Sequence, residues 1–145
     1  MKIVLAVVVS VLCVYVAVLL LLPSDVVERG YSSLADARTD HLFERGWLPD
    51  LLPASAHDIH TVNNLDLNLS DGEFSFKPAE AAAFVSRVQP YRAAPDQPEN
   101  IEPQVAKMRR KGFEPHSFRE ENTYWIFFCR AEAGYCEYTM WLHRA

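Results

Sequence analysis

The segment His57-Asp58-Ile59-His60 holds the residue types in this chain that are best suited to metal binding or acid–base chemistry. Residues two apart in a strand point to the same side, so Asp58 and His60 could share a metal ion. A third ligand would have to come from elsewhere, and no recognised spacing such as His-Glu-x-x-His is present. We therefore expect no metal site and interpret the segment as the polar, exposed start of a strand. Asp58 and His60 are the candidate ligands if a metal is bound.

Two other kinds of site are excluded by spacing. The run that begins at Asp66 matches a calcium-binding loop at three ligand positions, but the obligatory glycine would fall on Asp71 and the last carboxylate on Lys77. Ser55, His57 and Asp58 supply the letters of a hydrolase triad, but side chains this close in sequence cannot converge as a triad does. The chain has only five glycines, with neither a nucleophile elbow nor a phosphate-binding loop. We expect no catalytic residue and no cofactor.

The charge balance limits the kinds of partner that the chain could bind. The chain of 145 residues has 14 basic and 19 acidic residues, a formal net charge of −5, and all of these except Lys2 follow residue 23. An acidic domain argues against nucleic acid as a partner. We interpret the basic cluster at 107–111 as a solvated helix face. The interaction candidates are polar or aromatic and lie around the first segment: Trp47, His57, Asp58, His60, Asn64 and Asp66.

Residues 3–22 contain only uncharged and predominantly apolar side chains and are long enough to span a membrane. Twenty residues of helix measure roughly 30 Å, which is the thickness of the hydrocarbon core. Leu22 stands where a signal peptidase site needs a small residue, so we expect an uncleaved anchor, with a long cleaved signal as the alternative. Lys2 places the amino end inside. The sequence thus predicts an anchor at 1–23, a stalk at 24–32 and an extracytoplasmic domain at 33–145.

Cysteine usage agrees with export to an oxidising compartment. Cys13 lies within the expected span, which leaves Cys129 and Cys136 as one pair at short spacing. Such a pair outside the cytoplasm readily forms a disulfide. No Cys-x-x-Cys motif is present, so a thioredoxin-like activity has no support.

The sequence of the first half of the domain predicts a helix, an irregular segment and a hairpin. Ser33 and Gly46 are suited to begin and end a helix over 34–45. Residues 47–56 contain two prolines among large apolar side chains, which predicts an irregular strap over the core. Residues 65–76 alternate apolar and polar side chains on either side of Asp71-Gly72, the dipeptide preferred in two-residue hairpin turns.

The second half predicts helices at about 78–89 and 102–111, followed by strands at 116–120, 123–130 and 135–144. Placing Cys129 opposite Cys136 puts Phe127 opposite Tyr138 and Trp125 opposite Met140 on one apolar face. The abundance of aromatic side chains there fits either a core or an interaction surface. The whole pattern predicts an α+β domain that has an antiparallel sheet of two hairpins and two or three helices.

The chain resembles a family of small, uncharacterised bacterial membrane-anchored proteins. The resemblance consists of Gly46-Trp47-Leu48-Pro49, Leu52-Pro53-x-Ser55-Ala56-x-Asp58-Ile59, Asn64-Leu65-Asp66-x-Asn68 and Phe74-x-Phe76. It covers about thirty residues and implies a bacterial envelope protein with one soluble domain, but no activity.

The sequence therefore predicts a single-pass protein of the bacterial cytoplasmic membrane. Residues 3–22 would contact lipid, and a non-catalytic domain in the periplasm or outside the cell would bind a protein or envelope partner. Two alternatives stay open: a small envelope hydrolase or metal-dependent enzyme that uses His57, Asp58 and His60, and an accessory subunit of a membrane complex.

Overall fold

A single antiparallel sheet of seven strands organises the domain. The computed structural model of the chain describes residues 12, 15, 25–94 and 96–142. The strands lie in the spatial order β1-β2-β3-β7-β6-β5-β4. Their bounds are β1 Val26–Ser33, β2 His57–Asn64, β3 Leu69–Ser75, β4 Gln89–Pro90, β5 Glu114–Glu120, β6 Thr123–Arg130 and β7 Tyr135–Leu142. The helices are α2 Leu34–Thr39, α3 Ala81–Val85 and α4 Ile101–Arg110, with 3-10 turns at Pro78–Glu80 and Ala131–Ala133. The α+β class with an antiparallel sheet is as predicted.

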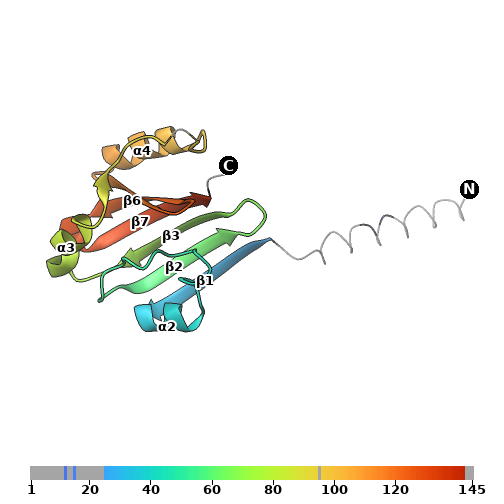
Figure 1. Cartoon of the computed structure of the whole chain (residues 1–145), viewed down its shortest axis with the longest axis horizontal. Coiled ribbons are helices and arrows are strands. Elements are labelled where there is room, and N and C mark those ends of the chain that lie inside the picture. Colours follow the sequence, from blue (N-terminus) through green and yellow to red (C-terminus); the bar gives the residue numbers. More distant parts are fainter. Residues whose placement is uncertain (1–11, 13–14, 16–24, 95, 143–145) are drawn as a thin grey trace, which may run out of the picture.

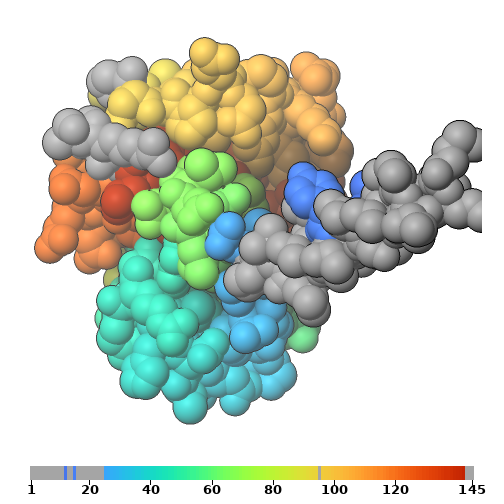
Figure 2. Space-filling view, turned by 90° about the vertical axis from the view of Figure 1, so that its right-hand side faces the viewer, coloured from blue at the N-terminus to red at the C-terminus, as the bar shows by residue number. Residues whose placement is uncertain are grey.

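Each face of the sheet carries its own hydrophobic core. On one face, α2, α3 and the strap cover a large cluster centred on Phe74, Phe84, Phe127 and Tyr138. On the other face, α4 packs Ile101, Val105 and Met108 against a smaller cluster of Ile126, Phe128 and Trp141. In Figure 1, α4 lies beside β6 and β7 and α2 beside β1, at opposite ends of the sheet. Figure 2 shows the teal segment that includes the strap and the gold α4 region on opposite sides of the green β2–β3 turn.

The carboxyl-terminal strands pair in the register that alternation predicted. Cys129 lies opposite Cys136, Phe127 opposite Tyr138 and Trp125 opposite Met140. A disulfide joins Cys129 to Cys136. Both faces of β6 are buried, because α4 covers the side chains that alternate with the apolar face. The predicted helix near 102–111 is α4, and Gly112 beyond it has φ +82°.

The predicted hairpin over 65–76 is wrong, because its turn lies elsewhere. The turn occupies residues 65–68 between β2 and β3, and Asp71-Gly72 lies in the middle of β3 opposite Val62 and Thr61. Asn64 closes the actual turn by accepting a hydrogen bond from the Leu67 amide at 3.0 Å. Gly72 is required for close packing instead: a Cβ there would stand 2.3 Å from the carbonyl oxygen of His60 and 2.6 Å from Cε1 of Tyr138.

The predicted stalk at 24–32 is also wrong, because β1 begins at Val26 and pairs with β2 along its length. The predicted helix at 34–45 is shorter than expected. It begins at Leu34 as predicted, with Ser33 as the N-cap whose hydroxyl accepts from the Asp36 amide, but it ends at Thr39. His41 follows with φ +57°, a left-handed conformation that a right-handed helix cannot contain. The helix predicted at 78–89 is reduced to a 3-10 turn and α3.

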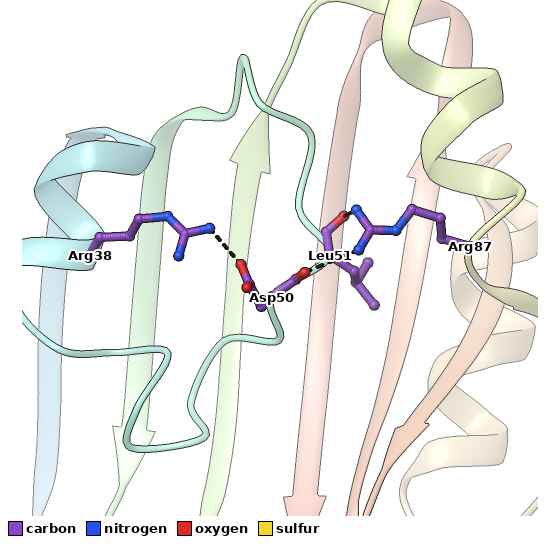
Figure 3. Close-up of polar contacts among 4 residues, drawn as sticks. All are labelled: Arg38, Asp50, Leu51 and Arg87. Atoms are coloured by element: carbon purple, nitrogen blue, oxygen red, sulfur yellow. Dashed lines mark hydrogen bonds and ion pairs between the residues drawn. The ribbon is translucent and has the colours of Figure 1, made fainter.

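The strap at 47–56 is irregular and apolar, as predicted, with Leu48, Leu51 and Leu52 buried in the larger core. Two arginines hold it from different elements (Figure 3). Arg87 donates from its two terminal nitrogens to the carbonyl oxygens of Leu51 and Asp50, both at 3.1 Å. Arg38 forms an ion pair with the Asp50 carboxylate.

The predicted membrane span at 3–22 lies outside the described residues except for Leu12 and Tyr15. Within the part of the chain that the structure describes, no helix is long and apolar enough to cross a membrane.

Candidate interaction surface

The residues predicted as a candidate site do not come together as one. His57 and Asp58 lie at an irregularity where two residues of β2, Asp58 and Ile59, oppose one residue of β3, and Asp58 has φ +48°. His57 is exposed, and its Nδ1 lies 3.0 Å from the carbonyl oxygen of Ser55. The bulge breaks the alternation on which a shared ligand for Asp58 and His60 depended. Among residues 25–94 and 96–142, no group of three or more His, Cys, Asp and Glu side chains is arranged to hold a metal ion.

The remaining candidates lie apart from one another. Trp47 is half-buried against the larger core, and Asp66 is exposed in the β2–β3 turn. Asn64 uses its side-chain oxygen to close that turn. Among these candidates, only His60 contacts a cluster of charged side chains: its Nε2 lies 2.8 Å from Oε1 of Glu28 on the neighbouring strand β1.

We call the surface around this cluster the acidic face. It lies on strands β1, β2, β3 and β7, on the same side of the sheet as α4. Its residues alternate along the strands with those of the larger core, so they point to the opposite side of the sheet. The ladder aligns His60 with Glu73 and Glu73 with Glu137. One step along, it aligns Glu28 with Val62 and Val62 with Asp71. Four carboxylates from three strands, β1, β3 and β7, thus gather on one face: Glu28, Asp71, Glu73 and Glu137.

Hydrogen bonds from neutral groups orient two of these carboxylates. The Tyr135 hydroxyl donates to Oε2 of Glu73 at 2.5 Å, and the Thr139 hydroxyl donates to Oδ1 of Asp71 at 2.6 Å. Gln104 of α4 in turn donates to the Thr139 oxygen at 3.0 Å. Burial, followed by the bond to Glu73 and the nearby carboxylates, raises the pKa of Tyr135 above its ordinary value. Tyr135 therefore stays protonated and acts as a donor across the physiological pH range.

A groove of about 480 Å³ runs between this face and α4. Asp71 and Glu137 line it from the sheet, and Gln104 and Lys107 line it from the helix. Within the described ranges, Lys107 forms no ion pair with a carboxylate, and of the four carboxylates only Glu28 has a basic partner, His60. The groove therefore holds two carboxylates without an ion-pair partner among the described residues, and Thr139 orients one of them, Asp71. This chemistry suits ammonium and guanidinium groups.

Sequence reasoning missed Glu28, Asp71, Glu73 and Glu137. Once β3 is extended through residue 75, the alternation of Asp71 and Glu73 along one strand indicates a shared side. The neighbour of β3 in the sheet is β7, about sixty residues further along the chain, and no local pattern predicts that contact.

The fold and this surface define a small α+β domain whose seven-stranded sheet has one half covered on both sides and one half open on the acidic side. Residues 25–75, which contain β1, α2, the strap, β2 and β3, match the family model described as the YbbD head domain. This match spans less than half of the 145-residue chain. No curated protein and no solved structure matches the chain.

Proposed function

We propose that this chain is a single-pass protein of the bacterial cell envelope whose α+β domain lies outside the cytoplasm. The domain binds the basic surface of a partner protein through the acidic face and carries out no catalysis. The observation that carries this proposal is the open half of the sheet, where Glu73 and Glu137 stand directly opposite each other without a basic partner among the described residues.

Like charges that face each other across a strand pair destabilise a sheet by roughly 0.2–1 kcal/mol. Lysine or arginine side chains of a partner would remove that repulsion and gain charge-assisted hydrogen bonds. Complementary charge also accelerates encounter and excludes wrong partners. The bound state would therefore have a lower electrostatic energy than the free domain, which favours recognition by charge at this surface.

Membrane anchoring and export are supported by the apolar stretch at 3–22, by the single basic residue Lys2 before it and by the disulfide between Cys129 and Cys136. A reporter fused to the carboxyl end should be active only outside the cytoplasm. Thiol labelling of intact cells should modify neither Cys129 nor Cys136 until a reductant is added. Reporter activity in the cytoplasm would reject the topology.

The binding surface is tested by crosslinking in intact membranes followed by affinity purification. The double variant Glu73→Gln/Glu137→Gln should lose a protein that the unmodified chain captures, and raising the salt concentration should release it. Glu44→Gln is the control, because Glu44 is an exposed glutamate like Glu73 but lies between the strap and α2. Equal capture by the double variant would reject the acidic face as the binding surface.

The enzyme alternative makes the opposite prediction at the β2 bulge. Under our proposal Asp58→Asn leaves both capture and stability unchanged, since the carboxylate is exposed and asparagine also tolerates the positive φ at the bulge. Loss of a cellular phenotype in Asp58→Asn with folding intact would favour catalysis. An accessory subunit would instead copurify with a complex at a fixed ratio.

A further inference from the structure

A second cavity, of about 370 Å³, lies at the outer edge of β5, away from the acidic face. It is lined from β5, β6, β7 and the segment after β4. β4 pairs with β5 only through Gln89 and Pro90. In the described part of the chain, no strand therefore covers β5 from Phe118 onward, and this interruption opens the cavity at the sheet edge.

Three arginines line this cavity, and none of them forms an ion pair among the described residues. Arg87 uses its terminal nitrogens on the strap carbonyls. Arg119 donates only from Nε, to the carbonyl oxygen of Glu121 at 3.0 Å, and its guanidinium lies 4.9 Å from the ring centre of Tyr124. The backbone of Arg92 is fixed by donating to Oγ of Ser117 at 3.2 Å. No carboxylate within residues 25–94 and 96–142 forms an ion pair with Arg92 or Arg119.

Aromatic rings form the walls between these arginines. Tyr124 and Trp141 stack on the α4 side of the sheet, with ring centres 5.5 Å apart and planes only 6° from parallel. Phe118 and Trp125 are in contact on the strap side, with ring centres 5.6 Å apart. Arg119 lies directly opposite Tyr124 and therefore on the same side of the sheet. A flat apolar group could pack on that side against the edge of the Tyr124 ring while a charged group reaches the arginines.

The indole N–H groups of Trp125 and Trp141 are buried donors for which the described residues supply no acceptor. The two side chains are only 2% and 3% exposed, and both line the cavity. Both nitrogens are closed off from the cavity, so a ligand there would contact the rings of these side chains and not their N–H groups.

We propose that this cavity binds a small oxyanion, a carboxylate or a phosphate, carried on a flat apolar body. Arg92 and Arg119 hold the oxyanion, and the apolar side chains on their side of the sheet, Tyr124 and Ile126, contact the flat body. The ligand proposed here is an anion, whereas the partner proposed for the acidic face is basic. The two proposals rest on different residues, so an experiment can reject either one without the other.

The experiment uses the full chain in a mild non-ionic detergent with ¹⁵N-labelled tryptophan. Its three indole N–H signals report on the site directly, because Trp125 and Trp141 line the cavity and Trp47 does not. 2-Naphthoate and 2-naphthyl phosphate should shift the signal of Trp141 saturably and leave Trp47 unchanged. The neutral 2-naphthamide should give no saturable shift, and inorganic phosphate should bind at least about tenfold more weakly than 2-naphthyl phosphate.

Arg92→Gln and Arg119→Gln should each weaken 2-naphthoate binding by about tenfold or more, as expected for loss of a charge-assisted hydrogen bond. Arg109→Gln is the control, because Arg109 also lies over an aromatic ring, Tyr91, but does not line the cavity. The proposal is overturned by equal binding of naphthamide, by phosphate binding as tight as that of 2-naphthyl phosphate, or by no saturable shift at Trp141. It is also overturned if Arg109→Gln weakens binding as much as Arg92→Gln. A variant is folded if its indole signals without ligand are unchanged. If Arg119→Gln does not fold, the result for Arg92→Gln alone tests the proposal.

Discussion

Glu73 of β3 and Glu137 of β7 stand directly opposite each other across the centre of the sheet. The Tyr135 hydroxyl donates to Glu73, but no such donor to Glu137 is found among the described residues. The pair therefore places two negative charges on adjacent strands at a site where one opposite charge would stabilise the sheet. The repulsion between the two carboxylates lowers the stability of the sheet, and a basic partner could neutralise their charge.

Glu137→Gln should raise the free energy of unfolding by roughly 0.2–1 kcal/mol, because it removes the repulsion and keeps the side-chain shape. Urea denaturation at low and high salt measures this change. The gain should shrink in high salt, since ions screen charges on an open surface. A loss of stability at low salt would show that the pair does not repel.

Gly72→Ala should destabilise the domain by about 1–3 kcal/mol or more, because the new methyl group would overlap the His60 carbonyl and the Tyr138 ring. Tyr138 cannot move away easily, since it is 2% exposed. Gly30→Ala in β1 is the control, as a Cβ at Gly30 meets nothing within 4 Å. Thermal unfolding of both variants measures the difference, and equal melting temperatures would contradict the packing role of Gly72.

The carboxyl-terminal strands could be predicted from sequence because one register satisfied every neighbouring pair. Once Cys129 faces Cys136, alternation places Trp125 and Phe127 on the same face as Tyr138. The strap was equally predictable, since prolines forbid regular structure while the leucines require burial. In both segments the local chemistry and the tertiary contacts favour the same structure.

The amino-terminal strands and the acidic face could not be predicted in the same way. β1 is an edge strand that carries Glu28 and Arg29, and charged edge strands lack the apolar alternation that identifies a strand. Asp71-Gly72 is compatible both with a tight turn and with close packing, and only the contact with Tyr138 distinguishes the two. The acidic face depends on pairing between β3 and β7, which no local pattern encodes.

The two arginines at the strap should differ in their effect on stability. Arg87→Gln removes two hydrogen bonds from a charged donor to strap carbonyls and should cost about 1–2 kcal/mol. Asp50→Asn removes the charge of the exposed ion pair with Arg38 but keeps the carbonyl that Arg87 uses. It should cost less than about 1 kcal/mol. Chemical denaturation of both variants tests this order, and a larger loss in Asp50→Asn would contradict it.

Reduction of the bond between Cys129 and Cys136 should lower the free energy of unfolding by roughly 2–3 kcal/mol, because the bridge closes a short loop. The ladder of β6 and β7 keeps the two residues opposed, so the reduced domain should stay folded. Cys129→Ala/Cys136→Ala should show no response to reductant. A reduced chain that is as stable as the oxidised chain would show that the bridge contributes nothing.

His116 should make stability depend on pH. Its side chain is buried between β5 and the larger core, and burial lowers the pKa of His116 below the ordinary 6.5, against a smaller opposing effect of Glu114. The unfolded chain therefore binds a proton that the folded chain resists, so stability is full above pH 6.5 and falls as the pH drops from there toward the lowered pKa. Denaturation at several pH values from about 7.5 to 5 measures this slope.

His116→Phe separates this effect from every other titrating group. The variant keeps a ring of similar size on the apolar face and removes both the proton site and a buried nitrogen, Nε2, that has no hydrogen-bond partner among the described residues and lies 3.9 Å from Oε2 of Glu114. Stability should then depend less steeply on pH between about 6.5 and 5, with little loss at neutral pH. Glu114→Gln is the companion variant, since losing the carboxylate that favours the charged ring should steepen the slope. Identical slopes in all three proteins would show that His116 does not govern acid sensitivity.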